Sequence, residues 1–280
     1  MTRLLVCGIA VMDYVHRVET LPTVEGKHRS TSFERIGGGC AANAAVGAAR
    51  LGAEVTLMTR LGADATGDEL AAMFADRAIT PAFARGGRTP LSSILIDSRG
   101  ERMIVNFPGL DLPTAPPSPP EFDVVLSDCR WPEAADAALR AALDRGVPSV
   151  LDGEKYTPEP LAALASHVVF SAPGLRDFTG IHDLPRALAD AAARLPNRVA
   201  YTDGPNGVYW ADGPHVPAPR IMPVDTLGAG DLWHGAFALA LGRGLDLIAA
   251  STFANTAAAL KCTRAGGWDH YPTSDELENA

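Results

Sequence analysis

The sequence predicts an α/β fold in which helices cover both faces of one mainly parallel sheet. Short apolar, β-branched runs alternate with Ala-rich stretches over most of the 280 residues, as in strand–helix–strand crossover units. Hydrophobic residues make up 47% of the chain and charged residues 20%, which is enough apolar surface for one large core. Two extended segments interrupt the alternation and indicate a second, smaller sheet.

The elements of the main sheet follow from the apolar runs and the stretches between them. Strands are expected at Leu4–Ala10, Glu54–Arg60, Asp123–Ser127, Val147–Asp152, His167–Ser171 and Arg198–Asp203. Helical spacing predicts helices at Ala41–Leu51, Gly67–Ala78, Pro132–Arg145, Pro185–Arg194, Asp231–Gly242 and Leu247–Thr263. The first run could also belong to a signal peptide, but Asp13 follows it without a small-residue cleavage pattern, so a buried strand explains it better.

The two interrupting segments, Asp13–Ile36 and Leu91–Phe107, predict a lid. The second contains a hairpin with strands at Ser92–Asp97 and Glu101–Phe107, joined by a short turn that includes Gly100. A small sheet outside the main one would suit a cover over an active site. The proline-rich stretch after it is expected to be a surface connection, so residues 1–280 are predicted to form one domain with a lid at about 13–36 and 91–107.

Composition excludes several classes of partner. The net charge of −9 argues against nucleic-acid binding, because neutralising phosphates requires clustered Lys and Arg. The sequence has no uncharged apolar stretch long enough to span a bilayer. The four cysteines form no CxxC pair, which fits reduced thiols rather than a disulfide framework or a zinc site. We therefore expect a cytoplasmic protein that acts on small molecules.

The most informative stretch is Asp225–Asp231, with the sequence Asp-Thr-Leu-Gly-Ala-Gly-Asp directly before an Ala- and Leu-rich helix. Glycines at 228 and 230 let consecutive N–H groups turn toward one point, where the helix N-terminus adds partial positive charge. The pattern predicts an anion site. A carboxylate at its rim suits a base that takes a proton from a hydroxyl attacking a bound phosphate. Asp231 could instead only cap the helix, but a cap would not require both glycines and the upstream Asp-Thr.

Two motifs give the chain a resemblance to the PfkB family of carbohydrate kinases. Residues 225–231 match the family's C-terminal signature DTxGAGD, and residues 38–43 match its N-terminal signature GGxxAN at the start of a helix. Matches at 62–67 and 202–207 extend the resemblance over nearly the whole chain. It implies a ribokinase-like fold, a three-layer α/β/α sandwich with a small β-sheet lid, and ATP-dependent phosphorylation of a sugar hydroxyl.

The resemblance also implies roles by position. Asp231 would be the catalytic base, and the transferred phosphoryl group would be held by Gly228, Ala229 and Gly230. Substrate hydroxyls would be held by Asp13, Gly38, Gly39 and Asn43. From the residues alone, Asp13 also fits a turn and Asn43 a helix cap. The nucleotide would contact Thr202, Gly204, Gly207, Asp225, Thr226 and Asn255.

One departure from the family pattern concerns the metal. Many members carry NxxE before a Leu-Thr-Gly, whereas this chain has Ser-Ala-Pro-Gly at 171–174 before Phe-Thr-Gly at 178–180. Mg²⁺ is still expected with ATP, because its charge neutralisation is central to phosphoryl transfer. The residues that organise the metal stay open, as does activation by a monovalent cation.

A finer resemblance points to the sulfofructose kinase branch of the family. Stretches at 8–13, 106–108, 128–131, 150–153 and 258–264 are similar to that branch, and its sulfonate-binding Lys, Asn and Arg would be Lys27, Asn106 and Arg130. These groups suit an ionised sulfonate, although Lys27 also fits a solvated lid charge and Arg130 a salt-bridge partner. Asn43 argues the other way, since the branch tends to have Thr there. The sequence predicts phosphorylation of a primary hydroxyl on an anionic ketose such as 6-deoxy-6-sulfofructose.

Other activities stay open at this stage. Fructokinase, ribokinase, ketohexokinase and nucleoside kinase activities fit the same motifs, and a sugar sensor without catalysis would explain the missing NxxE. The lid also predicts a homodimer, because an unpaired sheet edge invites a partner.

Overall fold

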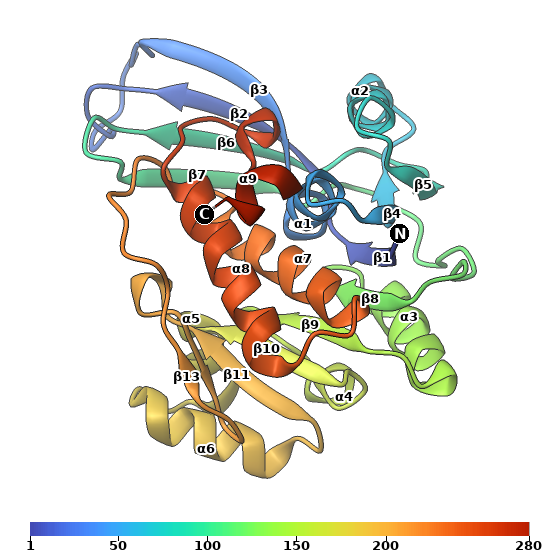
Figure 1. Ribbon diagram of the computed structural model, residues 1–280. Coiled ribbons are helices and arrows are strands. Elements are labelled where there is room, and N and C mark those ends of the chain that lie inside the picture. The colour runs from blue at the N-terminus through green and yellow to red at the C-terminus, as the bar shows by residue number, and fades with distance from the viewer. Residues whose placement is uncertain (280) are drawn as a thin grey trace.

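The computed structural model describes residues 1–279 and arranges their strands in two sheets (Figure 1). The larger sheet has nine strands in the order β13-β12-β11-β10-β9-β8-β1-β4-β5, and all neighbours from β11 to β5 run parallel. Their bounds are β1 Arg3–Gly8, β4 Glu54–Leu61, β5 Thr80–Arg85, β8 Val124–Ser127, β9 Ser149–Gly153, β10 His167–Ser171, β11 Arg198–Thr202, β12 Val208–Trp210 and β13 His215–Val216.

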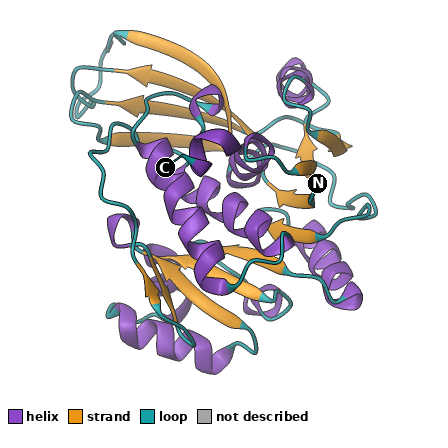
Figure 2. Ribbon diagram, viewed as in Figure 1, coloured by secondary structure: helices purple, strands orange, loops and turns teal. Residues whose placement is uncertain are grey.

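Helices cover both faces of this sheet (Figure 2). Alternate residues of β1 enter different cores: Leu4 and Val6 pack under the helices of one face, and Leu5 and Cys7 under those of the other. The first face holds α1 Cys40–Arg50, α2 Ala65–Ala75, α7 Ala229–Gly242 and α8 Leu247–Cys262. The second holds α3 Pro132–Arg145, α4 Glu159–Ala162, α5 Ala172–Thr179 and α6 Leu184–Arg194. The predicted three-layer α/β architecture is confirmed.

The smaller sheet is the lid, with strand order β3-β2-β6-β7. Its strands are β2 Val11–Arg17, β3 Ser32–Gly38, β6 Leu91–Ile96 and β7 Arg102–Phe107. Asp13 pairs with Ser92 across β2 and β6, and Ser92 pairs with Asn106 across β6 and β7. Paired residues share a face of a sheet. The lid therefore presents these three polar side chains on the same face as the apolar cluster of Val15, Ile94 and Ile96.

The predicted strands of the main sheet agree with the observed ones to within two residues at each end. In the first run, β1 ends at Gly8, two residues before the predicted end, and the chain enters the lid at Val11. A Cβ at Gly8 would lie 2.2 Å from the Asp128 carboxylate, so this break requires glycine. Asp13 consequently lies within the second strand and not at the end of the first.

Three strands and three α-helices were not predicted: β5, β12, β13, α4, α5 and α9 Ser274–Glu278. The short helix α5 begins with Pro173 and Gly174 in its first turn, which conceal helical periodicity. Its N-terminus is capped by the Ser171 hydroxyl, which accepts a hydrogen bond from the Gly174 N–H at 3.1 Å.

Among the described residues, no helix is both long enough and apolar enough to cross a membrane.

Candidate active site

The start of α7 and the start of α1, which carry the two motifs, lie near the junction of the lid and the main sheet (Figure 1). In open α/β sheets the carboxyl edge is where ligands bind. Asp231 stands in the first turn of α7, whose N-cap Gly228 has the left-handed backbone conformation, φ 74°. A Cβ at Gly228 would lie 2.3 Å from the Tyr271 hydroxyl. Glycine is therefore required for both the conformation and the space.

The first turn of α7 presents free donors, as the Gly-Ala-Gly pattern predicted. The N–H groups of Gly230 and Asp231 have no hydrogen-bond partner among the described residues. A Cβ placed on Gly230 would meet no atom within 4 Å, so the space in front of these donors is open. Helix N-termini with such donors bind anions. We call Gly228, Ala229 and Gly230 the phosphate cradle.

A chain of hydrogen bonds orients the Asp231 carboxylate. The Asn43 Nδ2 donates to Asp231 Oδ2 at 2.7 Å, and the Trp268 Nε1 donates to Asn43 Oδ1 at 2.8 Å. An indole N–H can only donate, so it fixes which end of the Asn43 amide faces the aspartate. Asn43 is the fourth residue of α1, after the N-cap Gly39, and its alternative role as a helix cap is excluded.

The electrostatic surroundings make Asp231 a weaker acid than an ordinary aspartate. Burial raises its pKa to about 7, nearby Glu154 and Asp128 add to the rise, and the Asn43 hydrogen bond opposes it. A carboxyl group with a pKa near neutral pH is well matched to accepting a proton from a hydroxyl.

The lid brings a second carboxylate to the site. Asp13 is 8% exposed. Burial raises the pKa of Asp13 to about 6, although the hydrogen bond with Ser92 acts to lower it. A Cβ at Gly38 would lie 2.0 Å from Asp13 Oδ2, and one at Gly39 would lie 2.6 Å from the Ile9 carbonyl oxygen. Both glycines of the N-terminal motif therefore make room for Asp13 and for the chain that leads to it.

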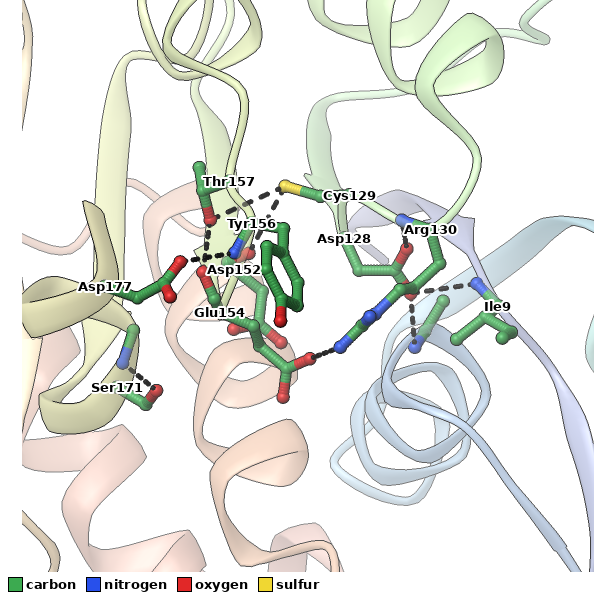
Figure 3. A network of polar contacts seen from close by, with 12 residues as sticks. Ile9, Asp128, Cys129, Arg130, Asp152, Glu154, Tyr156, Thr157, Ser171 and Asp177 are labelled. Carbon is green, nitrogen blue, oxygen red and sulfur yellow. Dashed lines mark hydrogen bonds and ion pairs between the residues drawn. The ribbon is translucent and has the colours of Figure 1, made fainter. Parts of the chain in front are cut away.

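Asp128, which sequence reasoning did not assign, ties three segments together beneath the site (Figure 3). Its carboxylate accepts hydrogen bonds from the backbone N–H groups of Ile9 at 2.8 Å, Ala41 at 3.2 Å and Arg130 at 2.8 Å. Burial raises the pKa of Asp128 to about 6 although these bonds oppose the rise. This carboxylate fixes the start of α1 relative to β1 and β8.

A further acidic group lies at the end of β9. Ligand atoms of Cys40, Asp152 and Glu154 all lie within 4.8 Å of one another. Asp152 is 6% exposed, and its carboxylate lies 3.5 Å from Nε2 of His234. Burial lowers the pKa of His234, so this ring carries no charge at neutral pH. Burial holds the pKa of Asp152 well above its usual range. Two carboxylates of this kind match the oxygen ligands that Mg²⁺ prefers. Burial also raises the pKa of the Cys40 thiol, which makes it a poor partner for a hard cation.

The three residues predicted to bind a sulfonate lie on three different segments of the chain. Asn106 lies beside Ser92, to which its Nδ2 donates at 3.2 Å. Arg130 forms an ion pair with Glu154, with Nη2 to Oε2 at 2.6 Å (Figure 3). Lys27 is exposed in the loop between β2 and β3, at the outer tip of the lid (Figure 1).

Four of the predicted nucleotide residues lie on β11, the turn that follows it and α8. Thr202 ends β11, Gly204 opens a short 3₁₀ turn, and a Cβ at Gly207 would lie 2.2 Å from the Val216 carbonyl oxygen. Asn255 is buried, donating to the carbonyl oxygens of Val216 at 3.0 Å and Pro217 at 3.1 Å. Its oxygen accepts from Trp233 Nε1 at 2.7 Å. Asn255 thus holds the loop after β13 with its own polar atoms engaged.

The last two predicted nucleotide residues lie just before the cradle. The Asp225 carboxylate accepts from the Leu227 N–H at 2.9 Å, and the Thr226 hydroxyl accepts from Arg102 of the lid at 2.8 Å. Beside them a cavity of about 1080 Å³ separates the lid from the 265–270 segment, with Ile36, Ile96, Asp225 and Trp268 in its wall. Sequence reasoning missed Trp268 and Tyr271, because no local pattern distinguishes them from core aromatics.

Comparison with known proteins identifies the family of the chain. Residues 1–274 match the family model described as pfkB family carbohydrate kinase. Ribokinase of Bacillus subtilis is 28% identical over 99% of both chains, and fructokinase of Klebsiella pneumoniae is 29% identical over 94% of this chain and 96% of its own. The crystal structure of an Agrobacterium tumefaciens protein is 36% identical, with a TM-score of 0.92 over 99% of this chain and 96% of that one. These relatives support the family and not the sulfofructose branch. The chain belongs to the pfkB family of carbohydrate kinases.

Proposed function

We propose that this carbohydrate kinase transfers the γ-phosphoryl group of ATP to a hydroxyl of a small neutral sugar, with ribose as the first candidate. One observation carries the proposal: the Asp231 carboxylate lies in the same helical turn as two free N–H donors. The ribokinase relatives favour ribose. The fructokinase relative makes fructose the next choice.

The chemistry follows from this arrangement. A sugar hydroxyl beside Asp231 gives its proton to the carboxylate as its oxygen forms a bond to the γ-phosphorus. The bond from that phosphorus to the β,γ-bridging oxygen breaks, and ADP leaves with the electron pair. The free N–H groups of Gly230 and Asp231, at the α7 N-terminus, stabilise the negative charge on the oxygens of the phosphoryl group during its transfer. The protonated Asp231 then returns its proton to solvent.

Sugar selection is proposed to rest on the lid and α1. Asp13 accepts hydrogen bonds from adjacent hydroxyls, and Asn43 aligns Asp231 with the reacting one. The carboxylates of Asp13 and Asp231 are proposed to face the same sugar, and their negative charge favours a neutral sugar over an anion. Arg130, one of the two cations predicted to bind a sulfonate, already forms an ion pair with Glu154. 6-Deoxy-6-sulfofructose, the substrate predicted from the sequence, is therefore included in the substrate panel described below.

Asp152 and Glu154 are proposed to take the metal-organising role that NxxE has in relatives. When Mg²⁺ accompanies ATP, it neutralises charge on the phosphates. Asp152 supplies a buried carboxylate whose side-chain neighbour is His234, at 3.5 Å. Glu154 supplies a second carboxylate, which can release Arg130 and bind the metal instead. The nucleotide itself is proposed to lie along Thr202, Gly204 and Gly207.

A homodimer through the lid is proposed as well. Phe33, Met103 and Val105 are 51%, 40% and 64% exposed. By strand alternation they lie on the face opposite Asp13. Large exposed apolar residues gathered on one small sheet are typical of an interface.

A substrate panel tests the activity. ADP release is measured with MgATP and ribose, 2-deoxyribose, fructose, 6-deoxy-6-sulfofructose or inosine. We expect the highest kcat/KM for ribose. Preference for the sulfonated ketose would restore the substrate predicted from the sequence, and preference for inosine would make the chain a nucleoside kinase. Sugar binding without ADP release would indicate a sensor and overturn the proposal.

A further inference from the structure

Lys261 is a charged residue that the proposed reaction does not use. It lies in the last turn of α8, and its exposed fraction is 0%. No other lysine or arginine among residues 1–279 is buried. An ammonium group withdrawn from water is costly unless oxygen atoms replace its hydration. Its contacts are therefore informative.

Those oxygen atoms belong to Asp225, the residue that opens the cradle motif. The Lys261 Nζ donates to the Asp225 carbonyl oxygen at 3.1 Å and lies 3.7 Å from the carboxylate Oδ2. The next residue, Cys262, accepts from the N–H groups of Val224 at 2.7 Å and Asp225 at 3.2 Å. The end of α8 thus holds the 224–225 backbone through both its acceptors and its donors.

The contact between Lys261 and Asp225 also affects the phosphate cradle. While Oδ2 of Asp225 faces the ammonium, its Oδ1 accepts from the Leu227 N–H at 2.9 Å. The turn made by that bond leads directly into Gly228, whose left-handed conformation begins α7. The direction of the cradle donors therefore depends on where Asp225 is held.

We infer that Lys261 is a positioning residue that supplies a tethered cation to the phosphate-binding loop, so that phosphoryl transfer needs no dissolved monovalent cation. A carbonyl oxygen and a carboxylate oxygen are the ligands that a potassium ion would use. Here the ammonium carries the same charge, and a second cation in the same place would be repelled. This inference rests on the proposed kinase activity.

The first test uses the unaltered protein. Sugar-dependent ADP release is measured at constant ionic strength in tetramethylammonium, potassium or ammonium chloride. We expect kcat to agree within about twofold in all three salts, because the loop's cation is covalently attached. Activity that collapses in tetramethylammonium chloride and returns with potassium would overturn the inference.

The second test removes the charge. Lys261→Met keeps the length of the side chain, and kcat should fall by about 100-fold as the cradle loses its alignment. Potassium, ammonium or methylammonium should restore part of that loss in a saturable way. Leu260→Ala is the matched control, because it trims packing in the same turn of α8 and leaves the ammonium in place. It should not respond to these cations.

Hydrogen exchange distinguishes a failure of the Lys261 inference from a failure of the proposed kinase activity. Peptides covering residues 223–230 should exchange faster in Lys261→Met than in the unaltered protein. Adding potassium to Lys261→Met should slow their exchange toward that of the unaltered protein. Unchanged exchange together with unchanged kcat would overturn the inference while leaving the kinase proposal intact. Absence of turnover with every sugar would instead overturn the proposed function, and the exchange measurement would still test the role of Lys261.

Discussion

Asp231 combines a raised pKa with a fixed orientation. Replacing it with asparagine keeps its shape but removes the base and its charge. We expect Asp231→Asn to lower kcat by about 10²–10⁴-fold and to leave sugar binding, measured by calorimetry, nearly unchanged. Asp136→Asn, on the exposed face of α3, is the matched control. Retention of more than a tenth of the activity would show that another group accepts the proton.

The pKa of about 7 predicts the pH dependence with a definite sign. Only ionised Asp231 can accept a proton, so kcat/KM should rise with pH and level off above about 7. Folded Asp231 binds its proton more tightly than unfolded aspartate, so this group lowers stability as pH rises from about 4 to 7. Relative to the unaltered protein, Asp231→Asn should therefore gain stability as pH increases. Urea titrations at several pH values measure this, and a constant difference would contradict it.

Glu154 allows a test of the proposed metal role. In Glu154→Gln the carboxylate is lost while the shape remains, so more Mg²⁺ should be needed for half-maximal activity at fixed ATP. We expect a shift of about tenfold. Mn²⁺ binding in the presence of ADP, followed by electron paramagnetic resonance, should weaken in parallel. Glu159→Gln removes an equivalent surface pair with Arg194 and should change neither measurement.

At the scale of elements, the Trp268 turn acts on the base through Asn43. Trp268→Phe keeps an aromatic ring but deletes the N–H that fixes the Asn43 amide. We expect kcat to fall about tenfold with a smaller change in KM. Trp210→Phe is the control, since it removes a similar buried bond, to Ser251 at 3.0 Å, away from the site. Equal losses in the two variants would indicate general destabilisation.

Elements differ in how well the sequence predicts them, and the reasons are physical. Pro132–Arg145 was predicted with its observed bounds, since Pro at the start and Gly after the end mark a helix locally. The motifs assigned Asn43 and Asp231 to one site, and the structure joins them by a hydrogen bond across 188 positions. Trp268, Asp128 and Asp152 could not be found this way. Their importance comes from neighbours that only the folded chain supplies.

At the scale of the whole molecule, the outer face of the lid exposes large apolar side chains that no other segment of residues 1–279 covers. Val105, 64% exposed on the edge strand β7, offers the sharpest test of the proposed dimer. A carboxylate there would have to be desolvated against an apolar partner surface. Val105→Glu should therefore convert a dimer at micromolar concentration into a monomer, as measured by sedimentation velocity. Because the substitution lies on the face opposite Asp13, the isolated monomer should still bind the sugar.

The matched control for the lid is Leu143→Glu. Leu143 is equally exposed, at 63%, but lies on α3, far along the chain from the lid strands. It should leave the sedimentation coefficient unchanged. If both variants and the unaltered protein sediment as monomers, the lid does not mediate pairing. If Leu143→Glu alone dissociates the dimer, the interface lies on the α3 face of the main sheet, and the exposed apolar residues of the lid serve another contact.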